Sequence, residues 1–229
     1  MYFEYGEAET EYLRRRDKRL SAVIEQVGHI DREVDDNLYA SVVHHIIGQQ
    51  VSTKAQQTIW LRLQDAFGAV EPQALAGASR DELQALGMTF RKADYILDFS
   101  RKVVQGDFDL AAVEQMPDDE AIRALVSLKG VGVWTAEMIL LFCLQRPNIL
   151  SFDDLAIQRG MRMVYRHRTI DREQFERYRR RLSPCCSVAS LYFWATSAGA
   201  IPGLTDPGKS RQGGTRGKKG AEKRTDQAL

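Results

Sequence analysis

The segment at residues 128–144, LKGVGVWTAEMILLFCL, constrains the fold more than any other part of the chain. Gly130 and Gly132 stand one residue apart, between an amphipathic run and a run that is apolar on nearly every side. Glycine adopts the left-handed backbone that ends many helices, so we expect Gly130 to close one helix and Gly132 to precede the next. The first N–H groups of that second helix are then free, and such a helix start attracts a phosphate group.

Two other interpretations of the glycine pair exist. The dinucleotide-binding pattern G-x-G-x-x-G/A fits poorly, because Thr135 occupies its last position and the preceding segment has a helical pattern where that motif needs a strand. The other interpretation, a tight turn that needs the glycines only for its backbone geometry, remains open. The pair therefore needs support from the rest of the chain.

Apolar residues recur at helical spacing from end to end, and alternating β-type runs are absent, which predicts an all-α fold of about ten helices. Leu13 to Val27 forms one charged first helix that Gly28 ends, Asn37 and Ser52 are helix caps, and Ser79 with Glu82 makes a capping box. We expect two helical subdomains with a cleft between them. The expected units are an N-terminal helix that packs with the C-terminal subdomain (1–36), a helical bundle (37–147) that ends in the two helices joined by the glycine pair (about 118–145), a C-terminal helical subdomain (148–205), and a disordered basic tail (206–229).

The composition is that of a globular protein and excludes few functions. The chain has 229 residues, 44% of them hydrophobic, and a formal net charge of +1, so any affinity for nucleic acid must come from local charge. No apolar stretch approaches the roughly 20 residues of a membrane span, and the N-terminus lacks a signal-peptide core. Cys143, Cys185 and Cys186 have no metal-site spacing, which predicts reduced thiols.

A pair of aspartates follows the glycine pair by about twenty residues, in the sequence ILSFDDLAIQRG. We expect Asp153 to be the N-cap of the helix that begins there, which leaves Asp154 for another role. His44 and His45 offer a second acid–base pair. Adjacent residues point in different directions on a helix, so core or surface histidines are the favoured interpretation.

LKGVGVWTAEMIL followed by SFDDLAIQR resembles the helix-hairpin-helix (HhH-GPD) DNA glycosylase superfamily, and the resemblance extends from about residue 36 to about residue 200. Together with IIGQQVSTKAQQ and SLYFWATSAG, it is most similar to the alkylbase branch of 3-methyladenine DNA glycosylase II type, in a compact form without the N-terminal β domain. The resemblance implies a glycosylase that hydrolyses the N-glycosidic bond of alkylated purines in double-stranded DNA during base excision repair. It also implies that the cleft between the two helical subdomains serves DNA binding and catalysis, that the helices at about 118–145 form a helix-hairpin-helix, and that the C-terminal subdomain (148–205) carries the catalytic aspartate.

The resemblance also implies roles for individual residues. Asp154 is the expected catalytic carboxylate, and Gln50 is the residue that fills the gap left when the damaged base is rotated out of the duplex. The expected base-binding residues are Trp134, Trp194, Met138 and Leu155. The expected DNA-strand contacts are Gly130, Gly132, Val133, Thr135, Arg91 and Lys92, with a solvated helix start as the alternative for the last two. Backbone carbonyls of Val126, Leu128 and Val131 are the expected ligands of a monovalent or alkaline-earth cation.

Several departures limit what the resemblance implies. Trp134 stands where strand-cutting members carry a lysine, so no abasic-site lyase activity is expected. The four cysteines of an iron–sulfur branch are missing, and no catalytic cofactor is expected. Cys186 replaces a common arginine and Met138 a tyrosine of some relatives, which leaves the range of excised bases open.

Two alternative functions remain. One is a mismatch or uracil glycosylase of the same fold. The other is a non-catalytic helix-hairpin-helix module, which would need neither the FDD element nor Trp194. In either case we expect a monomer without membrane association, in the cytoplasm at the nucleoid of a bacterium or in the nucleus of a eukaryote.

Overall fold

The computed structural model describes residues 1–208, and within them the predicted all-α fold is confirmed. An isolated bridge between Tyr2 and Glu33 is the β-type pairing present in this part of the chain. No helix in it is long and apolar enough to cross a membrane. The helices are α1 (Glu7–Arg16), α2 (Lys18–Val27), α3 (Leu38–Gly48), α4 (Thr53–Phe67), α5 (Pro72–Ala76), α6 (Arg80–Ala85), α7 (Phe90–Gln105), α8 (Leu110–Gln115), α9 (Asp118–Val126), α10 (Val133–Phe142), α11 (Leu155–Tyr165), α12 (Arg172–Leu182) and α13 (Cys186–Ala198).

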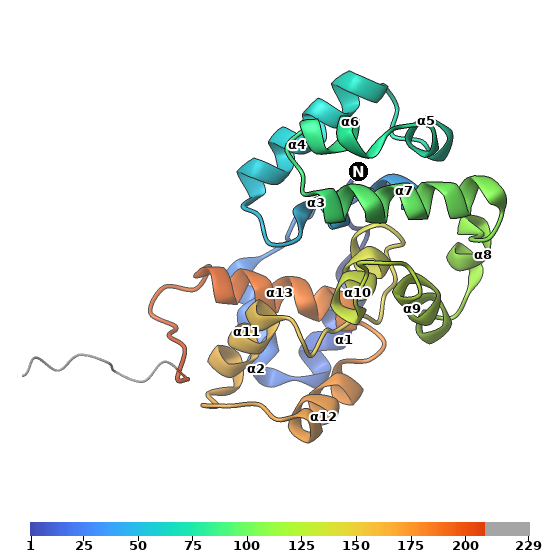
Figure 1. Ribbon diagram of the computed structural model, residues 1–229. Helices are drawn as coiled ribbons and strands as arrows, with labels where there is room; N and C mark the ends of the chain where they lie inside the picture. The colour runs from blue at the N-terminus through green and yellow to red at the C-terminus, as the bar shows by residue number, and fades with distance from the viewer. Residues whose placement is uncertain (209–229) are drawn as a thin grey trace, which may run out of the picture.

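The helices form two groups with α9 and α10 between them (Figure 1). In the first group α7 packs on α3, α5 and α6, and α4 packs on α3. In the second group α11 packs along α13, while α2 contacts both of them and α1 contacts α12 and α13. The two N-terminal helices therefore pack with the C-terminal part of the chain.

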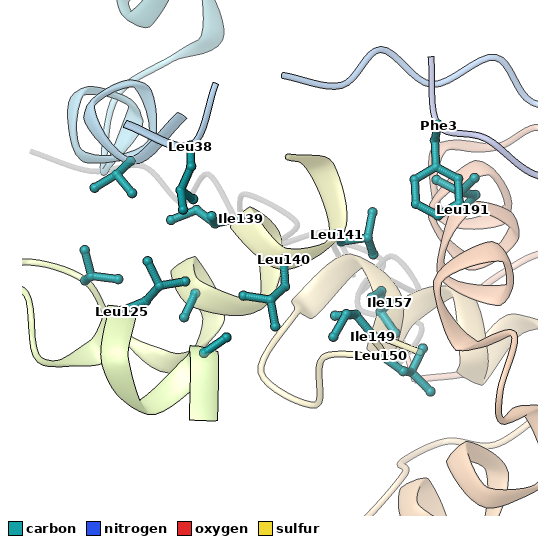
Figure 2. Close-up of a cluster of buried hydrophobic side chains, with 14 of the residues drawn as sticks. Phe3, Leu38, Leu125, Ile139, Leu140, Leu141, Ile149, Leu150, Ile157 and Leu191 are labelled. Carbon is teal, nitrogen blue, oxygen red and sulfur yellow. The ribbon is translucent and has the colours of Figure 1, made fainter. Parts of the chain in front are cut away.

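Helix α10 is apolar on nearly every side because it is buried from both directions. Figure 2 shows Ile139 near Leu38 of α3 and Leu125 of α9, and Leu141 on the side of Ile149 and the C-terminal helices. Ile139, Leu140 and Leu141 are completely buried. A helix with no polar face has to lie inside the protein, and α10 thereby joins the two groups into one continuous core.

The single N-terminal helix expected over residues 13–27 is wrong, because the chain breaks at Asp17 into α1 and α2. Asp17 is the N-cap of α2, where its Oδ1 accepts hydrogen bonds from the N–H groups of Arg19 and Leu20. Its Oδ2 accepts from the Tyr165 hydroxyl at 3.0 Å and from Arg181 at 3.1 Å. A buried carboxylate needs such partners, and the tertiary contacts hold the break in place. This break and the short helices α5 and α8 raise the count to thirteen helices in residues 1–208.

The predicted helix caps Asn37 and Ser52 are confirmed, as is the capping box of Ser79 and Glu82. The disorder predicted from residue 206 is wrong at its beginning. Asp206 is buried and accepts hydrogen bonds from Arg162 Nε and Nη2 at 3.0 and 2.6 Å, and such a bidentate pair orders both side chains. The rest of the predicted basic tail, 209–229, lies outside the described residues.

Cys185 and Cys186 are buried and Cys143 is partly buried, and all three are free thiols. Burial raises the pKa of Cys143 and of Cys186 to about 12. At neutral pH these thiols are therefore protonated, and a protonated thiol is a poor nucleophile and metal ligand.

Close packing of α11 on α13 depends on Gly160. A Cβ atom at this position would lie 2.1 Å from the Phe193 carbonyl oxygen. We expect Gly160→Ala to force the helices apart and to lower the free energy of unfolding by about 1–3 kcal/mol or more, as overpacking does. Chemical denaturation measures the change. The control is Gly77→Ala, whose Cβ would meet nothing closer than 3.9 Å, and equal stability of the two variants would contradict this account.

Candidate active site and DNA-facing hairpin

The hairpin between α9 and α10 has the backbone predicted for its glycines. Gly130 has a φ of 85°, in the left-handed region, and Gly132 is the N-cap of α10. The N–H of Val131 donates to the Leu128 carbonyl at 3.1 Å and tightens the turn. Within residues 1–208 no side chain caps α10, so its first N–H groups are left for an external acceptor such as a phosphate oxygen.

Helix α7 packs against the hairpin through Tyr95. A Cβ atom on Gly130 would lie 2.2 Å from Cδ2 of Tyr95, so the tyrosine ring occupies the space that a larger residue would need. Arg91 Nε donates to the Tyr95 hydroxyl at 2.6 Å, and Lys129 pairs with Asp98 at 2.6 Å. Gly130 is thus required both by its φ and by this contact.

The N-cap predicted for α11 is wrong by one residue. Asp154, not Asp153, is the cap, and its Oδ1 accepts from the N–H groups of Ala156 and Ile157 at 2.9 and 2.8 Å. Asp154 is 6% exposed, whereas Asp153 lies at the surface. Either aspartate satisfies the cap preference, and the choice follows from tertiary contacts that the sequence pattern does not contain.

Two tryptophans from different helices also bind the Asp154 carboxylate. Trp134 of α10 donates its indole N–H to Oδ2 at 2.9 Å, and Trp194 of α13 donates to Oδ1 at 3.1 Å. An ionised carboxylate only accepts hydrogen bonds, and here it receives four N–H donors. Oδ1 takes three of them and Oδ2 takes one, so Oδ2 keeps the greater capacity to accept a further partner.

The two indole rings have different surroundings. Trp134 is 42% exposed. Trp194 is half-buried, because Phe142 stacks on it with ring centroids 5.2 Å apart, and the Arg32 guanidinium lies 4.5 Å from the Phe142 centroid. Phe142 and Arg32 were not predicted as site residues. Phe142 is indistinguishable from core in the run MILLFCL, and Arg32 lies in a segment without a helical pattern.

The remaining predicted base-binding residues occupy opposite environments. Met138 lies one turn after Trp134 on α10 and is 3% exposed, while Leu155 directly follows Asp154 and is 85% exposed. Among the predicted strand contacts, Val133 is half-exposed and Thr135 is buried. Both lie in the first turn of α10, so the group of Thr135 that could contact a DNA strand is its main-chain N–H.

Gln50 lies at the surface in the turn between α3 and α4, with a φ of 55°. The phosphate contact predicted for Lys92 is not favoured by its geometry. Its ammonium group is turned into the protein, where it donates to the carbonyls of Ile47 and Gln49 at 2.7 and 2.6 Å. Arg91, by contrast, is at the surface beside the hairpin.

The adjacent histidines have separate structural contacts. His44 packs on Trp60 with ring centroids 4.7 Å apart, and His45 Nδ1 lies 2.9 Å from the Ser41 carbonyl. Burial lowers the pKa of both imidazoles, so both are neutral at pH 7. This agrees with the interpretation of the pair as core histidines.

Solved structures show the same fold. A DNA-3-methyladenine glycosidase from Bacillus halodurans is 31% identical, with a TM-score of 0.78 over 87% of this chain and 93% of that one. A 3-methyladenine DNA glycosylase (Mag1) from Schizosaccharomyces pombe, solved in complex with abasic DNA, is 23% identical, with a TM-score of 0.74 over 85% of this chain and 98% of that one.

Sequence comparison gives the same relationship. The Bacillus subtilis protein YfjP is 29% identical over 187 residues, which are 76% of this chain, and the chain spans 64% of the length of that relative. The sequence family described as "HhH-GPD superfamily base excision DNA repair protein" matches residues 43–185, more than half of the chain. The chain therefore belongs to the HhH-GPD superfamily of base excision DNA repair proteins.

Proposed function

We propose that this protein is a monofunctional DNA glycosylase that hydrolyses the N-glycosidic bond of alkylated purines of 3-methyladenine type, as the first step of base excision repair. One observation carries the proposal. A buried carboxylate, Asp154, is fixed by two indole N–H groups and a helix start, and the Trp134 that donates to it lies in the first turn of α10, the helix that begins at the hairpin. The names of the B. halodurans and S. pombe relatives support the class of lesion.

The carboxylate suits chemistry at the sugar. Breaking a glycosidic bond leaves an oxocarbenium-like centre, and a preorganised negative charge beside it lowers the barrier without reorganisation. Asp154 cannot rotate without breaking hydrogen bonds to α11 and to both tryptophans. The less occupied Oδ2 is the atom that would face the sugar or orient the attacking water.

The exposed indole of Trp134 suits the base. Alkylation at a ring nitrogen makes a purine cationic, and a cation over an indole ring gains about 0.5–2 kcal/mol. Trp134 offers open surface, while one face of Trp194 is already covered by Phe142. A cationic base also leaves readily, so no general acid is required for it. Met138 behind Trp134 and the exposed Leu155 complete the proposed base-binding residues.

The partner is double-stranded DNA, bound by a monomer. The main-chain amides at Gly132, Val133 and Thr135 would hold one strand through phosphate, as free helix starts do. Gln50 would enter the gap in the stack when the damaged nucleotide is rotated out. Its exposed position between α3 and α4 supports that role.

No cofactor is proposed for the chemistry. A monovalent or alkaline-earth cation could be held at the hairpin by the carbonyls of Val126, Leu128 and Val131, since hard cations prefer oxygen ligands. The Leu128 carbonyl accepts the Val131 N–H and keeps a second lone pair for such an ion. When bound, such an ion would add positive charge near the DNA phosphate.

We expect Asp154→Asn to lower the single-turnover rate of base release by about 100-fold or more, because charge opposite the sugar is removed while shape is kept. Release of labelled bases from methylated DNA measures it. DNA affinity should hold or rise, since the carboxylate repels phosphate.

The matched control is Asp153→Asn, which alters the exposed neighbour and should leave release intact. Unchanged release in Asp154→Asn would show that another group acts, and release from uracil-containing DNA alone would favour a uracil glycosylase.

The indole N–H of Trp194 should contribute to the rate of base release independently of its aromatic ring. Trp194→Phe keeps an aromatic ring beside Phe142 and removes one donor to Asp154. We expect the rate of base release to drop about tenfold, because a hydrogen bond to a charged group contributes roughly 1.5–3 kcal/mol. Trp60→Phe is the control, as its ring contacts His44 on a different helix pair. Equal rates in the two variants would contradict the orienting role of Trp194.

The enzyme should leave the abasic strand uncut. Trp134 offers no amine, and Lys129 is engaged by Asp98 at 2.6 Å. We expect borohydride to trap no covalent complex with damaged DNA, and strands to break only after alkali or heat. An adduct that forms with damaged DNA and survives Lys129→Ala would mean that another amine attacks the sugar, and the monofunctional assignment would be wrong.

A further inference from the structure

A buried lysine is hydrogen-bonded to the turn that carries Gln50. Lys92 lies in the first turn of α7 and is 9% exposed, and its ammonium group donates to the carbonyls of Ile47 at 2.7 Å and Gln49 at 2.6 Å. These carbonyls lie at the C-terminal end of α3, where carbonyls lack helical partners and attract a cation. Burial lowers the pKa of Lys92, in keeping with a group withdrawn from water.

The same turn is also fastened to the hairpin. Gln49 Nε2 donates to the Gly130 carbonyl at 2.6 Å. Gly130 in turn lies against the ring of Tyr95, which is three residues from Lys92 and so shares a face of α7 with it. One face of α7 therefore contacts both the Gln50 turn and the phosphate-facing hairpin, which are about 80 residues apart in sequence.

Gln50 itself has a backbone that needs such support. Its φ of 55° lies in the left-handed region, which costs a residue other than glycine roughly 1–2 kcal/mol. Strained conformations of this kind persist where the surrounding structure fixes them, and they gather at functional sites. Here the preceding residue is fixed twice, at its carbonyl by Lys92 and at its side chain by Gly130.

We propose that Lys92 is a positioning residue for base extrusion, which holds the Gln50 turn and the hairpin as one unit. The proposal rests on the function proposed above for Gln50. Gln50 then enters the duplex at a fixed distance from the phosphate that the hairpin binds. The turn does not have to sample other loop conformations first. The alternative is a direct contact of Lys92 with phosphate, which would require its ammonium group to leave both carbonyls.

The first test measures the turn without DNA. Lys92→Met keeps length and removes both hydrogen bonds, so amide hydrogen exchange of Gln49 and Val131, whose N–H groups donate to the Ile46 and Leu128 carbonyls, should become about tenfold faster or more. Lys92→Arg, which keeps the donors, should restore much of the protection. Arg91→Met on the same helix is the control and should leave the exchange of the Gln50 turn as it is. Unchanged exchange in Lys92→Met would overturn the proposal whatever the activity of the enzyme.

The second test separates positioning from phosphate binding. The slope of log affinity against log salt concentration becomes shallower by about 0.9 for each DNA phosphate that the protein ceases to neutralise. We expect Lys92→Met to keep the wild-type slope on undamaged duplex, because the wild-type ammonium group is held by carbonyls. A slope that is shallower by about one would overturn the proposal in favour of direct phosphate binding.

The third test uses two substrates that differ in the cost of extrusion. On a lesion paired in duplex DNA, Lys92→Met should lower single-turnover release about tenfold, and on a lesion opposite an abasic site the loss should be several-fold smaller. Gln49→Ala, which removes the hydrogen bond from the turn to the Gly130 carbonyl, should give the same pattern. An equal loss on both substrates would indicate general damage to the fold and overturn the positioning role. If the wild type releases neither base, the proposed function fails, and the exchange experiment still decides the role of Lys92.

Discussion

The burial of α10 is the constraint on which the other features depend. A helix with apolar residues on every side has to be covered by both halves of the protein, and the exposed residues of α10, Val133 and Trp134, lie at its N-terminal end. The N-terminal end offers free N–H groups and the exposed ring of Trp134, and the C-terminal end places Phe142 against Trp194. The hydrophobic effect thus sets the distance between the hairpin and the Asp154 carboxylate.

Asp154 combines a structural role with the chemical role proposed for it in one side chain. Its Oδ1 caps α11 and accepts the Trp194 N–H, while the one donor to Oδ2 in the described part of the chain is the Trp134 N–H. A buried charge without partners would be costly, and the four donors offset that cost while leaving one oxygen able to act. Burial of the carboxylate and its availability for chemistry are therefore compatible, because its two oxygens are used differently.

The sequence predicts the local parts of this structure well. The all-α fold, the caps at Asn37, Ser52 and Ser79, and the backbone of Gly130 and Gly132 follow from short-range patterns, and the structure confirms them. Asp154 and both site tryptophans were also expected as site residues, through the resemblance.

What the sequence could not supply is contact across long separations. The break at Asp17 depends on Tyr165 and Arg181, the cap at Asp154 on two tryptophans, and the inward turn of Lys92 on carbonyls 43 and 45 residues away. In each case the local sequence pattern allowed more than one arrangement, and the tertiary partner decided. The indole N–H contacts were not predicted, because in a sequence a tryptophan indicates first an aromatic ring, whereas here the donor atom makes the contact.

Asp154 is proposed to stabilise positive charge at the sugar, and the most direct test of this role is binding of DNA that mimics that charge. A duplex with a cationic pyrrolidine in place of the deoxyribose should bind the wild type at least tenfold more tightly than one with a neutral tetrahydrofuran, since about 1.4 kcal/mol of attraction gives that ratio. In Asp154→Asn the two duplexes should bind about equally. A preference for the cationic duplex that persists in Asp154→Asn would show that the charge is stabilised elsewhere.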